Sequence, residues 1–307
     1  AIMSAPSEGG ASRDGYGRGL LRLAKDERVV VLEADLGKST KSCHFREGFP
    51  DRTVSVGIAE QNMMLVAAGL ASSGKIPFAS TFAIFTERAF EQVRNGIARP
   101  GLSVHICGSH GGIHTGSDGS SAQSIEDLGI YRSIPKMTIL HPCDDLSAEE
   151  LTVKLLNNEG PSYMRTARNK TPVLYDGKEN DIQIGKGVVL RDGNDVAIIA
   201  CGVLVHESLE AAEKLSAEGM DATVKSRFHG VRAGLDVGLR CPGQTADDRT
   251  GFTADLLSDA LHSSEITVAG EGKARFNHID SQPGELLRDG QLFLEIQAGT
   301  GKTLINI

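Results

Sequence analysis

Short runs rich in valine and isoleucine alternate with longer stretches of helical periodicity through most of this 307-residue sequence. Because each run is long enough for one buried strand, the alternation predicts strand–helix units and a parallel sheet with helices on both faces. We therefore predict the α/β class with doubly wound domains. The strands predicted in the first part lie at residues 29–32, 54–56, 77–80, 103–107, 137–140 and 162–165.

A polar, glycine-containing stretch, YDGKENDIQIGKG, interrupts this alternation between residues 175 and 187. Such a stretch is typical of a linker, so we place a domain boundary near Gly177 and predict domains 1–177 and 178–307. A chain of this length can form two compact domains, each with its own core. In the second domain we predict strands at 196–200, 222–224, 266–269 and 292–296, and helices at 208–218 and 253–261.

Charge and cysteine usage exclude several classes of protein. The sequence has 32 Lys+Arg against 40 Asp+Glu, a net charge of -8, and no segregated basic face, so we predict no nucleic-acid partner. The five cysteines are widely separated and form no CxxC pair, which favours the reducing cytoplasm over a disulfide framework or zinc site. The apolar runs are too short for a membrane span, and no signal-peptide-like segment opens the sequence, so we predict no membrane partner.

Polar and aromatic side chains follow four consecutive predicted strands. Ligands of open parallel sheets bind outside the carboxyl ends of the strands, so these side chains are candidates for a binding site. Arg168, in MRTARNK, follows a later strand and suits a contact with an anion. The candidates after the four strands are Asp35 with LGKST, then Glu60, then Phe82 and Phe85, and then His110 with GGIHTGSDGSSAQ.

Each candidate also has a purely structural interpretation that the residues alone leave open. Glu60 opens the helical run EQNMMLVAAGLASSG, either as a first-turn carboxylate that complements the helix dipole or as a partly buried carboxyl with a raised pKa. Phe82 and Phe85 suit a core pair as well as an aromatic platform. The tract GSHGGIHTGSDGSS is either a surface turn or a binding loop, and Arg168 is either a solvated charge or an anion ligand.

Four stretches carry a family resemblance: VVVLEADLGKST, FPDRTVSVGIAEQNMMLVAAGLASSGKIPFASTFAIFTERAFEQVRN, GSHGGIHTGSDGSSAQSIEDLGIYRSIPKMTILHPCD and GPSYMRTARNKTPV. They follow one another in unbroken order over roughly residues 13–176, which exceeds a chance motif match. Together they resemble the C-terminal half of transketolase, most closely the separately encoded C-terminal subunit of split transketolases. The resemblance implies a thiamine-diphosphate enzyme with a pyrimidine-binding domain and a transketolase C-terminal-type domain. It also implies transfer of a two-carbon ketol (glycolaldehyde) unit from a ketose phosphate to an aldose phosphate.

The resemblance assigns cofactor-binding residues one by one. Glu60 matches the glutamate that hydrogen-bonds N1′ of the aminopyrimidine and favours the imino form, whose 4′-nitrogen removes the thiazolium C2 proton, so we predict it as catalytic. Phe82 and Phe85 match the aromatic pocket around the pyrimidine, where stacking on a flat ring is physically sensible. Asp35 matches an aspartate that lines the cofactor cleft. Arg88 stands where many transketolases have tyrosine, and we include it in the cofactor-binding set.

The resemblance also assigns substrate-binding residues. Ser39, His110 and Arg168 match positions that hold the sugar phosphate, and their side chains are apt donors for an anion. We predict His110 as catalytic as well. Asp118 matches the residue that contacts the C2 hydroxyl of the donor sugar.

Departures from the family pattern keep other functions open. The family's GEDGPTHQ reads GSDGSSAQ here, so Ala122 replaces a histidine that contacts the donor and assists proton transfer; His114 is a candidate substitute. An arginine at the position of Arg88 is similar to the pattern of 1-deoxyxylulose-5-phosphate synthase, a related enzyme. That enzyme, a 2-oxoacid dehydrogenase β subunit and a non-catalytic regulatory subunit of the same fold therefore remain alternatives. Beyond Gly187 the resemblance weakens, although VAIIACGVLVHESLEAAEKLSAEGMDATV still resembles the third domain of the family.

The GDG motif, through which transketolases bind diphosphate and a divalent metal in an N-terminal domain, is absent from the sequence. We therefore predict no metal ligand in this chain and assign Mg²⁺ (or Ca²⁺) mainly to an N-terminal transketolase subunit. An α2β2 heterotetramer, in which this chain also associates with itself, is the simplest arrangement. The sequence thus predicts activity only with that partner, on sugar phosphates.

Overall fold

A computed structural model describes residues 9–175 and 182–227 in full, and residues 229–230, 267–268, 274–275, 287–288, 291–298 and 301–306 as backbone strands. The chain forms two compact units, Ala1–Ala233 and Gly234–Ile307. The boundary predicted near Gly177 and the helix predicted at 253–261 lie outside the described residues.

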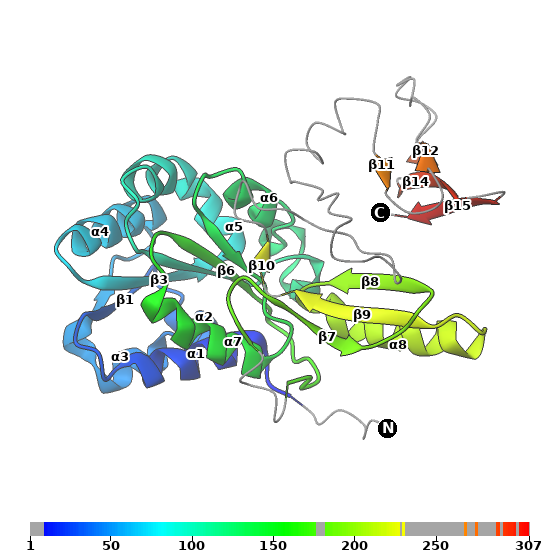
Figure 1. The fold of residues 1–307 in the computed structure, drawn as a ribbon. Helices are drawn as coiled ribbons and strands as arrows, with labels where there is room; N and C mark the ends of the chain where they lie inside the picture. The colour runs from blue at the N-terminus through cyan, green and yellow to red at the C-terminus, as the bar shows by residue number, and fades with distance from the viewer. Residues whose placement is uncertain are drawn as a thin grey trace. The chain divides into compact units, whose positions relative to one another are not determined.

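The first unit is built around a seven-stranded sheet with the order β10-β5-β6-β4-β3-β1-β2 (Figure 1). All neighbouring strands are parallel except β10, which is antiparallel to β5. The predicted α/β class and mostly parallel sheet are confirmed. Two predicted strands are shifted along the sequence: 103–107 lies at 105–109, and 54–56 lies at 53–55. The bounds are β1 (Val29–Glu33), β2 (Thr53–Ser55), β3 (Ile76–Phe82), β4 (His105–Ser109), β5 (Thr138–Leu140), β6 (Ser162–Thr166) and β10 (His229–Gly230).

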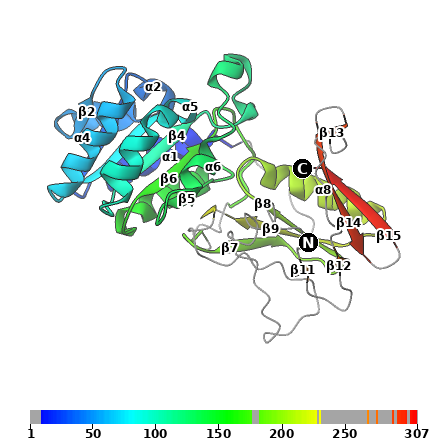
Figure 2. The same cartoon turned by 90° about the horizontal axis from the view of Figure 1, so that it is seen from above.

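Helices cover both faces of this sheet, as Figures 1 and 2 show. One face carries α1 (Ser12–Leu23), α3 (Cys43–Gly48) and α7 (Asp145–Lys154). The other face carries α4 (Glu60–Ser72), the π-helix η3 (Gln92–Ala98) and α6 (Asp127–Arg132). Shorter segments connect them: α2 (Gly37–Thr40), α5 (Ala83–Thr86), η1 (Pro50–Arg52), η2 (Glu87–Ala89), η4 (Ile113–Asp118), η5 (Ser120–Ala122) and η6 (Leu155–Asn157).

The alternation of side chains along β1 explains why both faces are covered. Val29 and Val31 belong to the hydrophobic core that contains Tyr16 of α1. Val30 and Leu32 belong to the opposite core, which contains the buried residues of α4. Successive side chains of a strand point to opposite faces, and all five β1 residues are buried. Such a strand is therefore stable in the middle of a two-sided sheet.

A three-stranded sheet with the order β7-β9-β8 completes the first unit. It consists of β7 (Gly187–Arg191), β8 (Val196–Ala200) and β9 (Ala222–Arg227), with α8 (Leu204–Ala217) between β8 and β9. The strands predicted at 196–200 and 222–224 are confirmed, and the helix predicted at 208–218 begins earlier, at Leu204. We did not predict β7, which pairs antiparallel with β9, because its apolar run of three residues is too short to stand out.

The second unit contains only antiparallel pairs among its described strands. These are β11 (Thr267–Val268), β12 (Ala274–Arg275), β13 (Leu287–Arg288), β14 (Gln291–Ala298) and β15 (Gly301–Asn306). β11 and β14 coincide with the strands predicted at 266–269 and 292–296. Within the described part of the chain, no helix combines the length and apolarity that a membrane span requires.

Candidate active site

The register of the parallel strands brings several strand ends to one edge of the large sheet. Glu33 pairs with Ser80, and Ser109 of β4 pairs with both Phe82 and Thr166. Residues that directly follow these ends are therefore neighbours in space although they are far apart in the sequence. The sequence-predicted residues that lie at or after the ends of β1, β2, β3, β4 and β6 are Asp35, Ser39, Glu60, Phe82, Phe85, Arg88, His110, Asp118 and Arg168.

Glu60 is the first residue of α4, and it is 5% exposed. The carboxylate lies in the first turn of a helix, where it complements the helix dipole, and it is buried as well. Among the described residues its one ion pair is with Arg88, whose Nη1 lies 3.8 Å from Oε2. Arg88 is exposed, so this pair is weak. The Glu60 carboxylate therefore keeps hydrogen-bonding capacity for a ligand.

The two phenylalanines form a stacked platform. Their ring centroids lie 5.6 Å apart, with 8° between the ring planes, and both rings are half-buried. The Arg88 guanidinium lies 4.9 Å from the Phe85 centroid, and the His110 ring stacks on Phe82 at 3.9 Å. Neither Phe82 nor Phe85 belongs to a hydrophobic core. The platform interpretation therefore fits better than the core interpretation, and the rings offer a flat surface to an aromatic ligand.

His110 is 2% exposed and adopts a left-handed backbone conformation, with φ 61°. Its Nδ1 lies 2.9 Å from Ser109 Oγ, and its Nε2 lies 3.4 Å from Arg13 Nη1. Because a guanidinium only donates, Nε2 accepts from Arg13, and Nδ1 carries the proton and donates to Ser109. Burial and, next, the charge of Arg13 lower the pKa of His110 to about 4. The imidazole is therefore neutral at pH 7.

Two arginines and an aspartate complete a polar cluster around His110. Asp118 Oδ2 lies 3.9 Å from His110 Nε2, and Asp118 Oδ1 lies 3.4 Å from Arg168 Nη2. Arg13 Nη1 also donates to the Ser39 carbonyl oxygen at 3.1 Å. Two guanidinium groups against one carboxylate leave the cluster with a net positive charge, which suits an anionic ligand.

Sequence reasoning missed Arg13. It lies in α1, and no predicted strand precedes it, so a search of strand ends passes over it. A single arginine in the first turn of an amphipathic helix carries no other local signal. Its role becomes visible only once packing brings α1 beside the ends of β1 and β4.

One predicted residue, Asp35, lies apart from these contacts, as do Ala122 and its candidate substitute, His114. Asp35 is exposed with φ 61°, and in the described part of the chain no hydrogen bond or ion pair joins it to the other candidates. Ala122 lies in η5. Burial lowers the pKa of His114 against the opposing charge of Glu207 in α8. The His114 ring therefore lies near α8, and no contact among the described residues joins it to Asp118.

A buried network holds the loop that carries Asp35 and Ser39. Glu33, at the end of β1, is completely buried, accepts a hydrogen bond from Ser42 Oγ at 2.9 Å, and pairs with Arg46. The loop passes so close that a Cβ at Gly37 would lie 2.0 Å from Glu33 Oε2. A larger residue at position 37 would have to displace the buried Glu33 carboxylate, so glycine allows the loop to lie tight against the sheet.

A second network closes the loop 110–124. The Ser124 carbonyl oxygen accepts a hydrogen bond from Gly112 N at 2.5 Å, and Ser124 Oγ donates to Glu87 Oε1 at 2.6 Å. Behind this closure, Arg165 pairs with Asp127, which is completely buried. Glu87 directly precedes Arg88, so the network ties the loop 110–124 to the segment that carries the aromatic platform.

Among the described residues, Cys43, His44 and Glu47 are the one group whose ligand atoms lie within 4.8 Å of one another. All three belong to the short helix α3 and are separate from the contacts that join Glu60 to Arg168. Cys43 is buried, whereas His44 and Glu47 are exposed. The contacts between Glu60 and Arg168 combine a buried carboxylate, a flat aromatic surface and a cluster with a net positive charge.

Family comparisons agree with this geometry. The transketolase pyrimidine-binding domain matches residues 11–173, which is more than half of the chain, and the transketolase C-terminal domain matches residues 185–228. A protein of Methanocaldococcus jannaschii named as a transketolase C-terminal section is 44% identical over 215 residues, which cover 69% of this chain and 68% of that protein.

The chain matches a small part of one further relative and most of another. The mouse transketolase-like protein 2 is 42% identical over 222 residues, which cover 71% of this chain but only 35% of that protein. The solved structure of a split-gene transketolase, described as an inactive β4 tetramer, superposes with a TM-score of 0.66 at 43% identity. The match covers 72% of each chain. The match to this chain thus covers about a third of the mouse protein.

Proposed function

Because this chain belongs to the transketolase family, we propose that it is the C-terminal, pyrimidine-binding section of a thiamine-diphosphate-dependent transketolase. The proposed reaction moves a two-carbon ketol (glycolaldehyde) unit from a ketose phosphate to an aldose phosphate, as in the pentose phosphate pathway. One observation carries the proposal: an unbroken series of contacts runs from the Glu60 carboxylate through the aromatic platform and His110 to Arg168.

The first half of this series fits an aminopyrimidine. Glu60 offers a buried carboxylate with one weak partner, and Phe82 and Phe85 offer a flat, half-buried surface beside it. We propose that Glu60 holds a proton at N1′ of the pyrimidine while the rings keep water from that edge. Thiamine diphosphate, when bound, supplies the carbon nucleophile that takes up and passes on the two-carbon unit.

The second half fits a phosphorylated sugar. Arg13 and Arg168 supply the positive charge, and His110, which is neutral, contributes a hydrogen-bonding edge rather than a charge. Asp118 lies between Arg168 and His110 and would repel a phosphate placed against it. We therefore propose that Asp118 accepts a hydrogen bond from a sugar hydroxyl, while the phosphate lies toward the two arginines and Ser39.

A partner subunit completes the proposed site. The chain contains no GDG motif, and it spans only 35% of the mouse relative. The split-gene neighbour is described as inactive when it contains β chains alone. These observations support an N-terminal subunit that holds the diphosphate and Mg²⁺ (or Ca²⁺), an α2β2 heterotetramer, and a cofactor bound between subunits. The widely spaced cysteines support a cytoplasmic location.

Arg88 supports a second candidate, an enzyme of the 1-deoxyxylulose-5-phosphate synthase type. Its guanidinium contacts both the Phe85 ring and the Glu60 carboxylate, so it lies where it can influence donor choice. Pyruvate is the donor that distinguishes this reaction from ketol transfer.

Reconstitution separates the two candidates. The full chain is mixed with the N-terminal subunit, thiamine diphosphate and Mg²⁺, and then assayed with ketose phosphates plus an aldose phosphate and, separately, with pyruvate. We expect ketol transfer and no decarboxylation of pyruvate. Arg168→Ala should raise KM about 10- to 150-fold for a phosphorylated ketose only, since a charge-assisted contact contributes about 1.5–3 kcal/mol. Turnover of pyruvate, or an equal effect on unphosphorylated ketoses, would contradict the assignment.

A further inference from the structure

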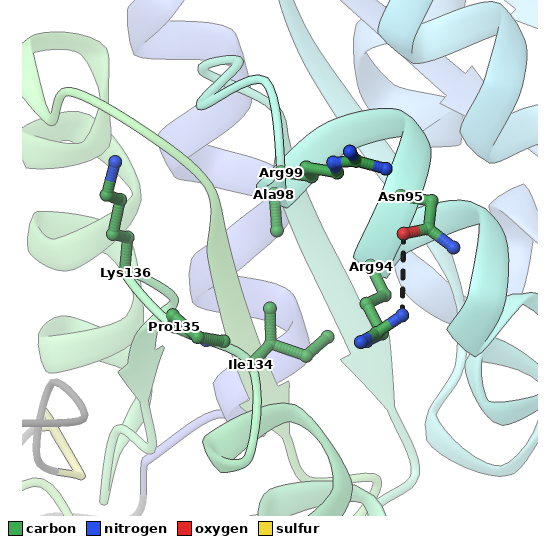
Figure 3. A pocket seen from close by; sticks show the side chains of 7 residues that line it. All are labelled: Arg94, Asn95, Ala98, Arg99, Ile134, Pro135 and Lys136. Atoms are coloured by element: carbon green, nitrogen blue, oxygen red, sulfur yellow. Dashed lines mark hydrogen bonds between the residues drawn. The ribbon is translucent and has the colours of Figure 1, made fainter.

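A pocket of about 220 Å³ lies at the opposite edge of the large sheet (Figure 3). Arg99 precedes β4 and Lys136 precedes β5, so the pocket opens near the amino ends of these strands. Isoleucine, proline and alanine side chains line the wall between the cations. We call this pocket, lined by Arg94, Asn95, Ala98, Arg99, Ile134, Pro135 and Lys136, the arginine pocket.

The π-helix η3 places two arginines on the same side of the arginine pocket. Arg99 N donates to the Arg94 carbonyl oxygen at 2.9 Å, a hydrogen bond between residues five apart. In an α-helix, residues five apart lie about 140° apart around the axis and cannot share a face. The wider turn of η3 instead brings Arg94 and Arg99 one above the other, with Lys136 on the facing loop (Figure 3). Such turns are frequent at functional sites.

The charge in the arginine pocket is not neutralised by the protein. In the part of the chain that the structure describes, none of Arg94, Arg99 and Lys136 forms an ion pair. Arg94 donates only to the neutral Asn95 amide oxygen, at 3.4 Å. The nearby Glu91 is hydrogen-bonded to Asn95 Nδ2 at 2.6 Å. Three cationic residues thus line one pocket without an acidic partner among the described residues, in a chain whose net charge is -8.

We propose that the arginine pocket binds a small phosphate-bearing anion. The guanidinium groups of Arg94 and Arg99 can provide charge-assisted hydrogen bonds, and Asn95 adds an amide. The volume is below the about 300–1,000 Å³ typical of pockets for drug-sized ligands, so it favours free phosphate or a small phosphate monoester over a nucleotide. In a monoester, the carbon skeleton would lie against Ile134 and Pro135.

Thermal unfolding of the full chain tests this binding without an activity assay. The parent for the experiment carries Arg13→Ala and Arg168→Ala, which remove the positive charge of the candidate active site. The pocket variant adds Arg94→Ala and Arg99→Ala, whereas the matched control adds Arg22→Ala and Arg28→Ala, two other exposed arginines. Each protein is heated in chloride and in phosphate at constant ionic strength. A ligand that binds only the folded state raises Tm.

We expect phosphate to raise Tm of the parent and of the control, and we expect the pocket variant to lose this rise. An equal rise in the pocket variant, or no rise in the parent, would overturn the proposal. Glycerol 3-phosphate, with glycerol as its control, distinguishes the sources of the anion. A larger rise than with free phosphate indicates an organic phosphate, and an equal rise indicates that only the phosphate group is recognised. A rise with glycerol alone would contradict anion binding.

Discussion

The imidazole of His110 stacks on the ring of Phe82, with 3.9 Å between ring centroids and 23° between ring planes. Phe82 in turn stacks on Phe85, which contacts Arg88. Phe82 therefore contacts both the proposed pyrimidine site, through Phe85, and the proposed phosphate site, through His110. The strand register explains the contact, because Phe82 pairs with Ser109, the residue before His110.

This relationship predicts different effects for the two phenylalanines. Phe82→Leu should raise both the cofactor concentration for half-maximal activity and KM for the sugar phosphate. Phe85→Leu should raise only the former, since it does not touch His110. An aromatic pair contributes about 0.5–1.5 kcal/mol, which corresponds to about 2- to 13-fold in each constant. Steady-state kinetics of the reconstituted enzyme measures both constants, and identical profiles for the two variants would argue against the shared contact.

Arg13 is predicted to bind the substrate phosphate together with Arg168. Arg13→Ala should raise KM for phosphorylated sugars about 10- to 150-fold and leave unphosphorylated analogues unaffected, because a charge-assisted contact of about 1.5–3 kcal/mol is lost. The matched control is Arg22→Ala, in the same helix, whose side chain pairs with Glu149 and Glu150 on the surface. A normal KM in Arg13→Ala would exclude it from the site.

The buried pair of Asp127 and Arg165 is predicted to stabilise the fold beneath the substrate loop. Asp127→Ala leaves the largely buried guanidinium of Arg165 without its partner and should lower the free energy of unfolding by about 3–5 kcal/mol. Glu150→Ala, which removes a surface partner of Arg22, should lower it by at most about 1 kcal/mol. Urea unfolding measures both values, and equal losses would refute the prediction.

Buried histidines predict a loss of stability in mild acid. Burial lowers the pKa of His105 to about 3, and the pKa of His110 is about 4. In the unfolded chain both histidines have a pKa of about 6.5. Between about pH 6.5 and pH 4 the unfolded state therefore binds more protons than the folded state. The stability that comes from keeping these two histidines neutral is therefore fully present above about pH 6.5, and it is lost as the pH falls. Each should contribute a slope of up to about 1.4 kcal/mol per pH unit.

His105→Asn tests this slope, because an amide can replace Nδ1 in its hydrogen bond to Ser162, which is 2.9 Å long. The free energy of unfolding is measured between about pH 6.5 and pH 5, where histidines titrate but most carboxylates do not. The slope should decrease by up to about 1.4 kcal/mol per pH unit relative to the unsubstituted chain. An unchanged slope would show that His105 is not a source of the pH dependence.

Sequence reasoning located the residues whose position depends on local structure. Glu60 and Phe82 lie within four residues of the ends of predicted strands, and the ends of parallel strands meet at one edge whatever the details of packing. Arg13 was missed because it reaches the site only through the packing of α1. Arg94 and Arg99 lie side by side because η3 is a π-helix. A periodicity search that assumes 3.6 residues per turn would separate them.

The account as a whole rests on a cofactor site divided between two chains. Calorimetry with thiamine diphosphate and Mg²⁺, on the chain alone and after addition of the N-terminal subunit, tests this division, and Glu60→Gln is run in parallel. We predict weak binding to the chain alone, because a diphosphate needs a metal and fixed donors to leave water, and tight, Mg²⁺-dependent binding once the partner is present. Glu60→Gln should bind more weakly only in the complex. Tight, Mg²⁺-dependent binding by the isolated chain would contradict the account.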